Sequence, residues 1–139
     1  MLICFKETAL QRNPGRTLEE IEKEYLRVYG KKKMIWLNKM PLMDKVLEGA
    51  KAGNYFGYGA NGHTDEFVRF ANDSTILIGL IDAKDKNDDP VSNIDFDILH
   101  DNLEILEQLF PGRTIVQINP LFLNKNGGGM HCASQQQPK

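Results

Sequence analysis

The stretch Thr75-Ile76-Leu77-Ile78-Gly79-Leu80 is an apolar, β-prone segment that predicts a strand. A second segment of this kind, Glu66 to Phe70, precedes it. The residues between them, Ala71 to Ser74, have the composition of a tight turn. The sequence therefore predicts a β-hairpin from residue 66 to residue 80.

A helix and a further strand are predicted after this hairpin. A polar surface loop is expected from Asp82 to Asn93. The helix is expected to follow this loop and to end at Pro111-Gly112, and Thr114 to Ile118 predicts a strand by its β-branched content. The helical prediction rests on apolar residues at helical spacing, namely Ile94, Ile98, Leu103, Leu106 and Leu109.

Helix and strand signals also alternate in the first half of the chain. Thr17 stands three residues before Glu20 in a capping box, which predicts a helix that ends near Gly30. The apolar run Met34 to Leu37 predicts a buried strand, and residues 42–51 predict a second, weaker helix. Glycine-rich sequence then leads into His63. The alternation as a whole predicts an α/β fold.

Size and composition restrict the class of protein. The 139 residues are enough for one domain, and a formal net charge of −2 gives no electrostatic reason to expect a nucleic-acid partner. No apolar run approaches the ~18 residues of a membrane span, so no membrane partner is expected and a cytoplasmic location is the default expectation. Cys4 and Cys132 lie in very different surroundings and do not suggest a disulfide framework.

His63 and Asp65 are candidate functional residues. At positions i and i+2 of an expected strand they would point to the same face, where both could act on one ligand. An imidazole moves protons near neutral pH, and a carboxylate holds a cation through charge-assisted hydrogen bonds. Taken alone, this short pattern is also typical of a structural or surface pair.

Cys132 is a candidate nucleophile. It closely follows Gly127-Gly128-Gly129, which would let a ligand approach the backbone and leave N–H groups available for developing negative charge. The alternative is a buried cysteine that acts as a small apolar residue. His131 is expected to face away from the thiol on a strand, and a zinc site made from His63, Asp65, His131 and Cys132 has no short paired-ligand spacing.

Read together, several motifs resemble the agmatine deiminase family, which also contains the bacterial Porphyromonas-type peptidyl-arginine deiminases. The most specific is the terminal GGGMHCASQQQP, followed by Gly62-His63-Thr64-Asp65-Glu66-Phe67. The resemblance covers nearly the whole chain. The other matching motifs are Arg12-Asn13-Pro14-Gly15, Ile35-Trp36-Leu37, Arg69-Phe70 and Phe110-Pro111-Gly112-Arg113.

The resemblance implies a fold, a reaction and roles for the candidate residues. The fold would be a partial pentein-type α/β propeller, with about two of five mixed strand-helix modules. Cys132 would be the nucleophile, His63 the general acid/base and Asp65 a catalytic guanidinium ligand, with Gly128 and Gly129 beside the substrate. The substrate would be agmatine or an arginine derivative, and neither a metal nor an organic cofactor is expected.

Two departures from the family pattern concern completeness. The family's chains are longer, and their preceding modules supply a second guanidinium-binding carboxylate and an acidic partner for the histidine. His63 and Cys132 are only 69 positions apart, which indicates an internal deletion within the helix Asp101 to Glu107. We expect one partial domain over residues 1–139, with the GHTDEF module in residues 1–110 and the end of the last module in residues 111–139. A non-catalytic remnant that binds a ligand or subunit is the alternative, and homo-oligomer formation stays open.

Overall fold

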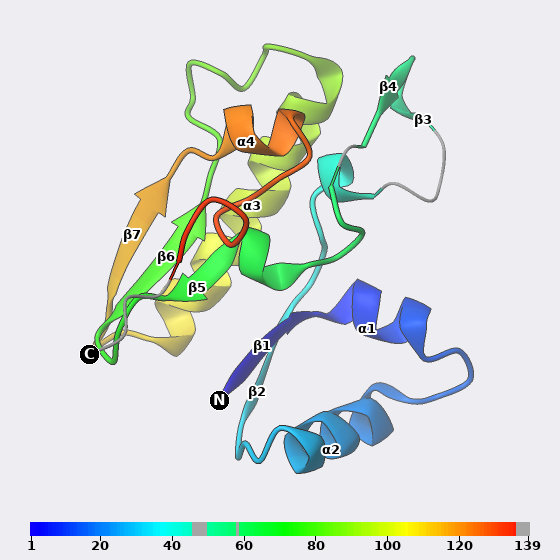
Figure 1. The fold of residues 1–139 in the computed structure, drawn as a ribbon, viewed down its shortest axis with the longest axis vertical. Coiled ribbons are helices and arrows are strands. Elements are labelled where there is room, and N and C mark those ends of the chain that lie inside the picture. Colours follow the sequence, from blue (N-terminus) through cyan, green and yellow to red (C-terminus); the bar gives the residue numbers. More distant parts are fainter. Residues whose placement is uncertain (46–49, 58, 136–139) are drawn as a thin grey trace.

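The computed structural model describes residues 1–45, 50–57 and 59–135. A parallel strand pair with two helices lies at one end of the molecule, and a three-stranded sheet with a long helix lies at the other (Figure 1). Within the described ranges, no helix combines the length and the apolar composition needed to cross a bilayer.

The N-terminal strand pair consists of β1 (Leu2–Phe5) and β2 (Met34–Leu37), which run parallel. The crossover between them contains α1 (Lys6–Arg12) and α2 (Leu18–Val28). Sequence analysis predicted α2 and β2 but no strand at β1. The short apolar segment 2–5 becomes a strand because it pairs with β2 over four residues.

The start of α2 confirms the predicted capping box. The Thr17 hydroxyl accepts a hydrogen bond from the Glu20 N–H at 3.2 Å, and the Glu20 carboxylate accepts one from the Thr17 N–H at 2.9 Å. Gly30 follows the helix with a φ of 60°, a left-handed conformation that favours glycine. The predicted start and end of this helix are therefore both confirmed.

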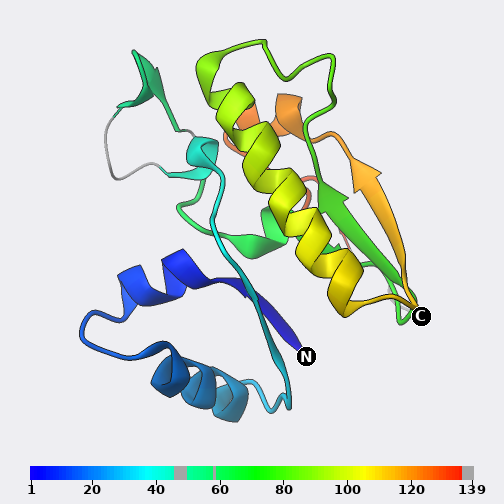
Figure 2. The ribbon, with the colours of Figure 1, turned by 180° about the vertical axis from the view of Figure 1, so that it is seen from behind.

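The second sheet has the strand order β5 (Val68–Phe70), β6 (Thr75–Gly79) and β7 (Thr114–Ile118). β5 and β6 form the predicted antiparallel hairpin, whereas β6 and β7 run parallel. α3 (Pro90–Leu109) connects β6 to β7 and covers one face of the sheet (Figure 2). The short helix α4 (Leu121–Lys125) follows β7 and leads into the glycine loop.

α3 begins earlier than predicted, so the last four residues of the expected surface loop belong to the helix. The Asp89 carboxylate accepts a hydrogen bond from the Ser92 N–H at 2.7 Å, and Pro90 occupies the first helical position. Both features favour a helix start. The spacing of the apolar residues alone did not reveal this cap.

The helix expected over residues 42–51 is wrong where the structure describes it. Residues Leu42–Asp44 form the 3₁₀ helix η1, and Ala50–Ala52 form β3, which pairs antiparallel with β4 (Tyr55–Phe56). Residues 46–49 lie outside the described residues. The N–H groups of Leu42 and Met43 donate to the carboxylate of Asp95 in α3, so contacts with a distant helix hold this turn.

One apolar cluster joins the two ends of the molecule. Phe5 from β1 and Phe67 before β5 are both buried, and their ring centroids lie 6.1 Å apart. The rest of the cluster comes from both sheets and α3, and includes Ile35, Leu37, Ile76, Ile78, Leu99 and Leu106. The α/β prediction is thus confirmed, while none of the three sheets in the described part of the chain closes on itself.

Candidate active site

The Asp44 side chain holds the backbone that leads to His63. This side chain is fully buried and accepts hydrogen bonds from the N–H groups of Ala60 at 2.6 Å and Gly62 at 2.5 Å. Burial raises the pKa of Asp44, although the two N–H donors and the charge of His63 act in the opposite direction. Asp44 is therefore an acidic residue close to His63 that sequence analysis did not identify.

Gly62 allows the chain to reach His63. Its φ of 97° is unusual for any residue with a side chain, and an added Cβ would collide with the side chain of Thr8 in α1. The position of His63 thus depends on close packing between this loop and α1. His63 itself is exposed.

His63 and Asp65 do not lie on a strand, so the prediction of a shared strand face is wrong. Thr64–Glu66 form the 3₁₀ helix η2, with His63 just before it. The Glu66 N–H donates to the His63 carbonyl at 3.1 Å and the Phe67 N–H donates to the Thr64 carbonyl at 3.0 Å. These bonds tighten the backbone into a turn, and β5 starts only at Val68.

Asp65 contacts His131 from the C-terminal loop. The His131 Nε2 lies 3.5 Å from the Asp65 Oδ2, and both side chains are about half exposed. The sequence predicts that His131 lies on a strand and faces away from the thiol. Residues 130–133 instead form a turn, which brings His131 toward η2. A cation that bound Asp65 would compete with this contact.

The glycine loop follows α4, and two of its N–H groups are already used. The Gly127 N–H donates to the Asn124 carbonyl at 3.1 Å, and the Gly128 N–H donates to the Leu123 carbonyl at 3.0 Å. The expectation that these two groups are free is therefore wrong, because they complete the last turn of α4. The buried Asn124 side chain also donates to the Gly128 carbonyl at 2.8 Å.

Glu66 joins η2 to the loop that carries Cys132. The Met130 N–H donates to the Glu66 carbonyl at 3.2 Å, and the Cys132 Sγ lies 4.0 Å from the Glu66 Oε1. Cys132 is exposed, whereas Glu66 is only 3% exposed. Cys132 is therefore not the buried, small apolar residue of the alternative prediction.

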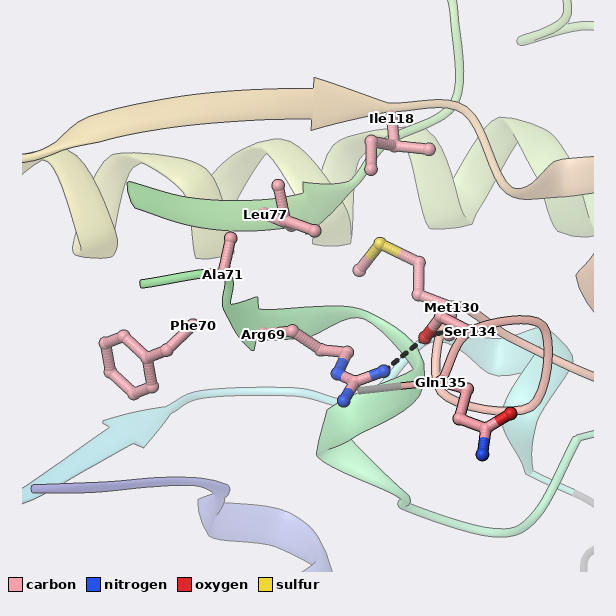
Figure 3. Close-up of a pocket in the computed structure, with 8 residues that line it drawn as sticks. All are labelled: Arg69, Phe70, Ala71, Leu77, Ile118, Met130, Ser134 and Gln135. Carbon is pink, nitrogen blue, oxygen red and sulfur yellow. Dashed lines mark hydrogen bonds between the residues drawn. The ribbon is translucent and has the colours of Figure 1, made fainter. Parts of the chain in front are cut away.

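Two hollows flank Arg69 beside this loop. One, of about 580 Å³, is lined by Arg69, Leu77, Ile118, Met130 and Ser134, and the Arg69 guanidinium donates to the Ser134 hydroxyl (Figure 3). The other, of about 350 Å³, is lined in part by Asp65, Arg69 and His131. Neither is lined by Cys132. Among the described residues, no three His, Cys, Asp or Glu side chains are grouped as metal ligands.

Comparison with known proteins identifies the family. The sequence profile of the Porphyromonas-type peptidyl-arginine deiminases matches residues 2–102 and 100–138. The chain belongs to this family. A putative agmatine deiminase of Streptomyces coelicolor is 25% identical over 182 residues, covering 92% of this chain and 51% of the relative. One of Legionella pneumophila strain Philadelphia 1 is 24% identical over 201 residues, with 99% and 52% covered.

Solved structures support the same fold. The C. jejuni agmatine deiminase superposes with a TM-score of 0.51 at 13% identity, covering 99% of this chain and 52% of that chain. A cysteine-to-serine variant of that protein with substrate bound gives a TM-score of 0.54 at 12% identity, with 99% and 53% covered. At these identities the likeness concerns the fold alone.

The chain spans about half the length of the relatives it matches. The alignment with the S. coelicolor relative extends over 182 residues, more than the 139 of this chain, so that relative carries segments with no counterpart here. The two profile matches meet at residues 100–102, inside α3. The junction lies at the start of the stretch Asp101 to Glu107, within which an internal deletion is expected, and α3 is one continuous helix there.

Proposed function

We propose that this chain carries the nucleophile end of a cysteine-dependent guanidine deiminase site. One observation motivates the proposal: residues 65–66, just after His63, meet residues 130–132 in space although they are far apart in sequence. Three contacts join them, namely Met130 N–H to the Glu66 carbonyl, His131 to Asp65, and Cys132 to Glu66. The residue types at this junction are those that a thiol-dependent hydrolysis of a cationic group requires.

In the proposed reaction the Cys132 thiolate attacks the guanidinium carbon, and a carbon–sulfur bond forms. The carbon–nitrogen bond then breaks, and ammonia leaves with a proton from His63. Water, deprotonated by the same imidazole, adds to the thiouronium carbon, and the carbon–sulfur bond breaks to restore the thiol. The net reaction converts a guanidine and water into a ureido group and ammonia.

Asp65 is the proposed ligand of the guanidinium group. A carboxylate can accept two hydrogen bonds from a planar guanidinium, which fixes the carbon beside the nucleophile. The His131 Nε2 lies 3.5 Å from one oxygen of this carboxylate, so a bound guanidinium would compete with His131 for that oxygen. Gly128 and Gly129 stay proposed backbone neighbours of the substrate.

The proposed substrate is agmatine, giving N-carbamoylputrescine, or peptidyl-arginine, giving peptidyl-citrulline. The relatives are about twice as long, so substrate-binding groups on their additional residues would be missing from this chain. Loss of one preorganised electrostatic group typically lowers a rate by roughly 10²–10³-fold. We therefore expect slow turnover by the chain alone.

The direct test is formation of ureido product and ammonia from agmatine. We expect product from the unmodified chain and from Cys4→Ala, because Cys4 lies in β1 outside the proposed machinery. Cys132→Ala should give background only. Equal, background-level product from all three proteins would refute turnover, and calorimetry with agmatine would then show whether binding alone persists.

A further inference from the structure

Glu66 is a buried carboxylate to which the proposed reaction assigns no part. It is 3% exposed, and its Oε2 has no hydrogen-bond partner among the described atoms. Burial of a carboxylate costs free energy unless its neighbours compensate. Such a residue needs a reason for its position, and the sequence alone would place an acidic residue at the surface.

Three neighbouring positions of the C-terminal loop rest on Glu66. Gly129 packs so closely that an added Cβ would lie 2.8 Å from the Glu66 Cγ and 2.9 Å from its Cα. The Met130 N–H donates to the Glu66 carbonyl at 3.2 Å. The Cys132 Sγ lies 4.0 Å from the Glu66 Oε1. The loop thus contacts Glu66 through its backbone, the aliphatic part of its side chain and its carboxylate.

We propose that Glu66 is a positioning residue that seats the 129–132 loop and holds the Cys132 thiol against η2, the turn that follows His63 and contains Asp65. The inference rests on the proposed function only in calling Cys132 a nucleophile. The S–H group donates toward the Glu66 Oε1, which fixes one direction of the otherwise exposed side chain. The nearby backbone hydrogen bond from Met130 to the Glu66 carbonyl also joins the loop to η2.

The charges around Glu66 agree with this role. Burial raises the pKa of Glu66, the Asp44 carboxylate raises it further, and the charge of His63 lowers it. A negative charge on Glu66 makes its Oε1 a stronger acceptor for the Cys132 S–H group, and Glu66→Gln removes that charge.

The test measures the rate of alkylation of Cys132 by iodoacetamide against pH, by mass spectrometry of the Cys132 peptide. In Glu66→Gln, which keeps the side-chain volume, we expect alkylation of Cys132 to become several-fold faster at about pH 8, because the S–H group loses the charged acceptor that holds it against η2. A purely structural role would leave the rate of Cys132 relative to that of Cys4 unchanged.

Two internal controls keep the test decisive. Cys4, half-buried in β1, reports on folding in the same digest and should keep its rate. Glu66→Asp retains the charge but moves the carboxylate away from the sulfur. We expect its rate of Cys132 alkylation to change less than that of Glu66→Gln. If only one variant folds, that variant still decides the matter: a Cys132 profile identical to that of the unmodified chain overturns the proposal.

Alkylation needs no turnover, so the two proposals fail separately. A chain that releases no ureido product but shows the Glu66-dependent profile would refute the activity and retain the positioning role. If the chain turns over agmatine but all variants share one Cys132 alkylation profile, the activity would be retained and the positioning role refuted.

Discussion

Gly128 and Gly129 are neighbours with different structural requirements. A Cβ added to Gly128 would lie 3.6 Å from the Cys132 Cβ, an ordinary contact distance. The same addition at Gly129 would meet the backbone and side chain of Glu66 at under 3.0 Å. Of these two glycines, Gly129 is therefore the one that must lack a side chain for the loop to reach Glu66.

We expect Gly129→Ala to lower the free energy of unfolding by about 1–3 kcal/mol, the usual cost of overpacking a buried contact. Gly128→Ala is the matched control and should stay within about 0.5 kcal/mol of the unmodified chain. Urea denaturation of the three proteins measures both values. Equal stability of the two variants would contradict the packing of Gly129 on Glu66.

The sequence predicted the family better than the local geometry of the candidate site. The motifs around His63 and Cys132 were sufficient to name the family. The turn at residues 64–66 was not predictable from alternation, because the loop that leads into it is held by hydrogen bonds to Asp44, which lies outside the local sequence pattern. Glu66 was missed because a single acidic residue in a sequence carries no sign of burial.

At the scale of elements, local signals were sufficient where the stabilising contacts are local. The β5–β6 hairpin and α2 were predicted because a turn and a capping box lie within a few residues. The segment 42–51 was mispredicted because η1 is held by Asp95, about fifty positions away in α3. Tertiary contacts here outweigh the weak helix propensity of the segment.

Asp95 makes this connection sensitive to pH. Its side chain is fully buried, and burial raises its pKa to about 7 despite hydrogen bonds from the Met43 and Leu42 N–H groups. In the unfolded chain the pKa is near its ordinary value of about 3.9. The folded state thus binds more protons between these values, and its stability falls as pH rises from about 4 to above 7.

We predict that Asp95→Asn removes this part of the pH dependence. The unfolding free energy of the unmodified chain, taken relative to Asp95→Asn, should fall by about 2–4 kcal/mol from pH 4 to pH 8, since one pKa unit corresponds to about 1.4 kcal/mol. Urea denaturation across this range measures it. Asp101→Asn, an exposed site on the same helix, should follow the curve of the unmodified chain. Parallel curves for all three would refute the assignment.

For the whole molecule, the side of the sheet opposite α3 is incompletely covered. The C-terminal loop crosses part of this side (Figure 1), but apolar side chains near it stay exposed. Val116 is 40% exposed, Ile118 37% and Phe122 79%. β7 is also an edge strand of its sheet in the described structure. Unpaired strand edges and exposed apolar side chains favour association with another chain.

We predict that the chain self-associates through β7 and α4. Size-exclusion chromatography with light scattering over a concentration series should give a mass that rises above the 15.8 kDa of one chain. A double variant, Ile118→Thr with Phe122→Ser, should shift this rise to at least about tenfold higher concentration, which corresponds to about 1.4 kcal/mol. Because Ile94 on α3 has a similar exposed fraction of 40%, Ile94→Thr is the matched control. An equal shift with Ile94→Thr would mean that general surface hydrophobicity, and not this edge of the sheet, drives association.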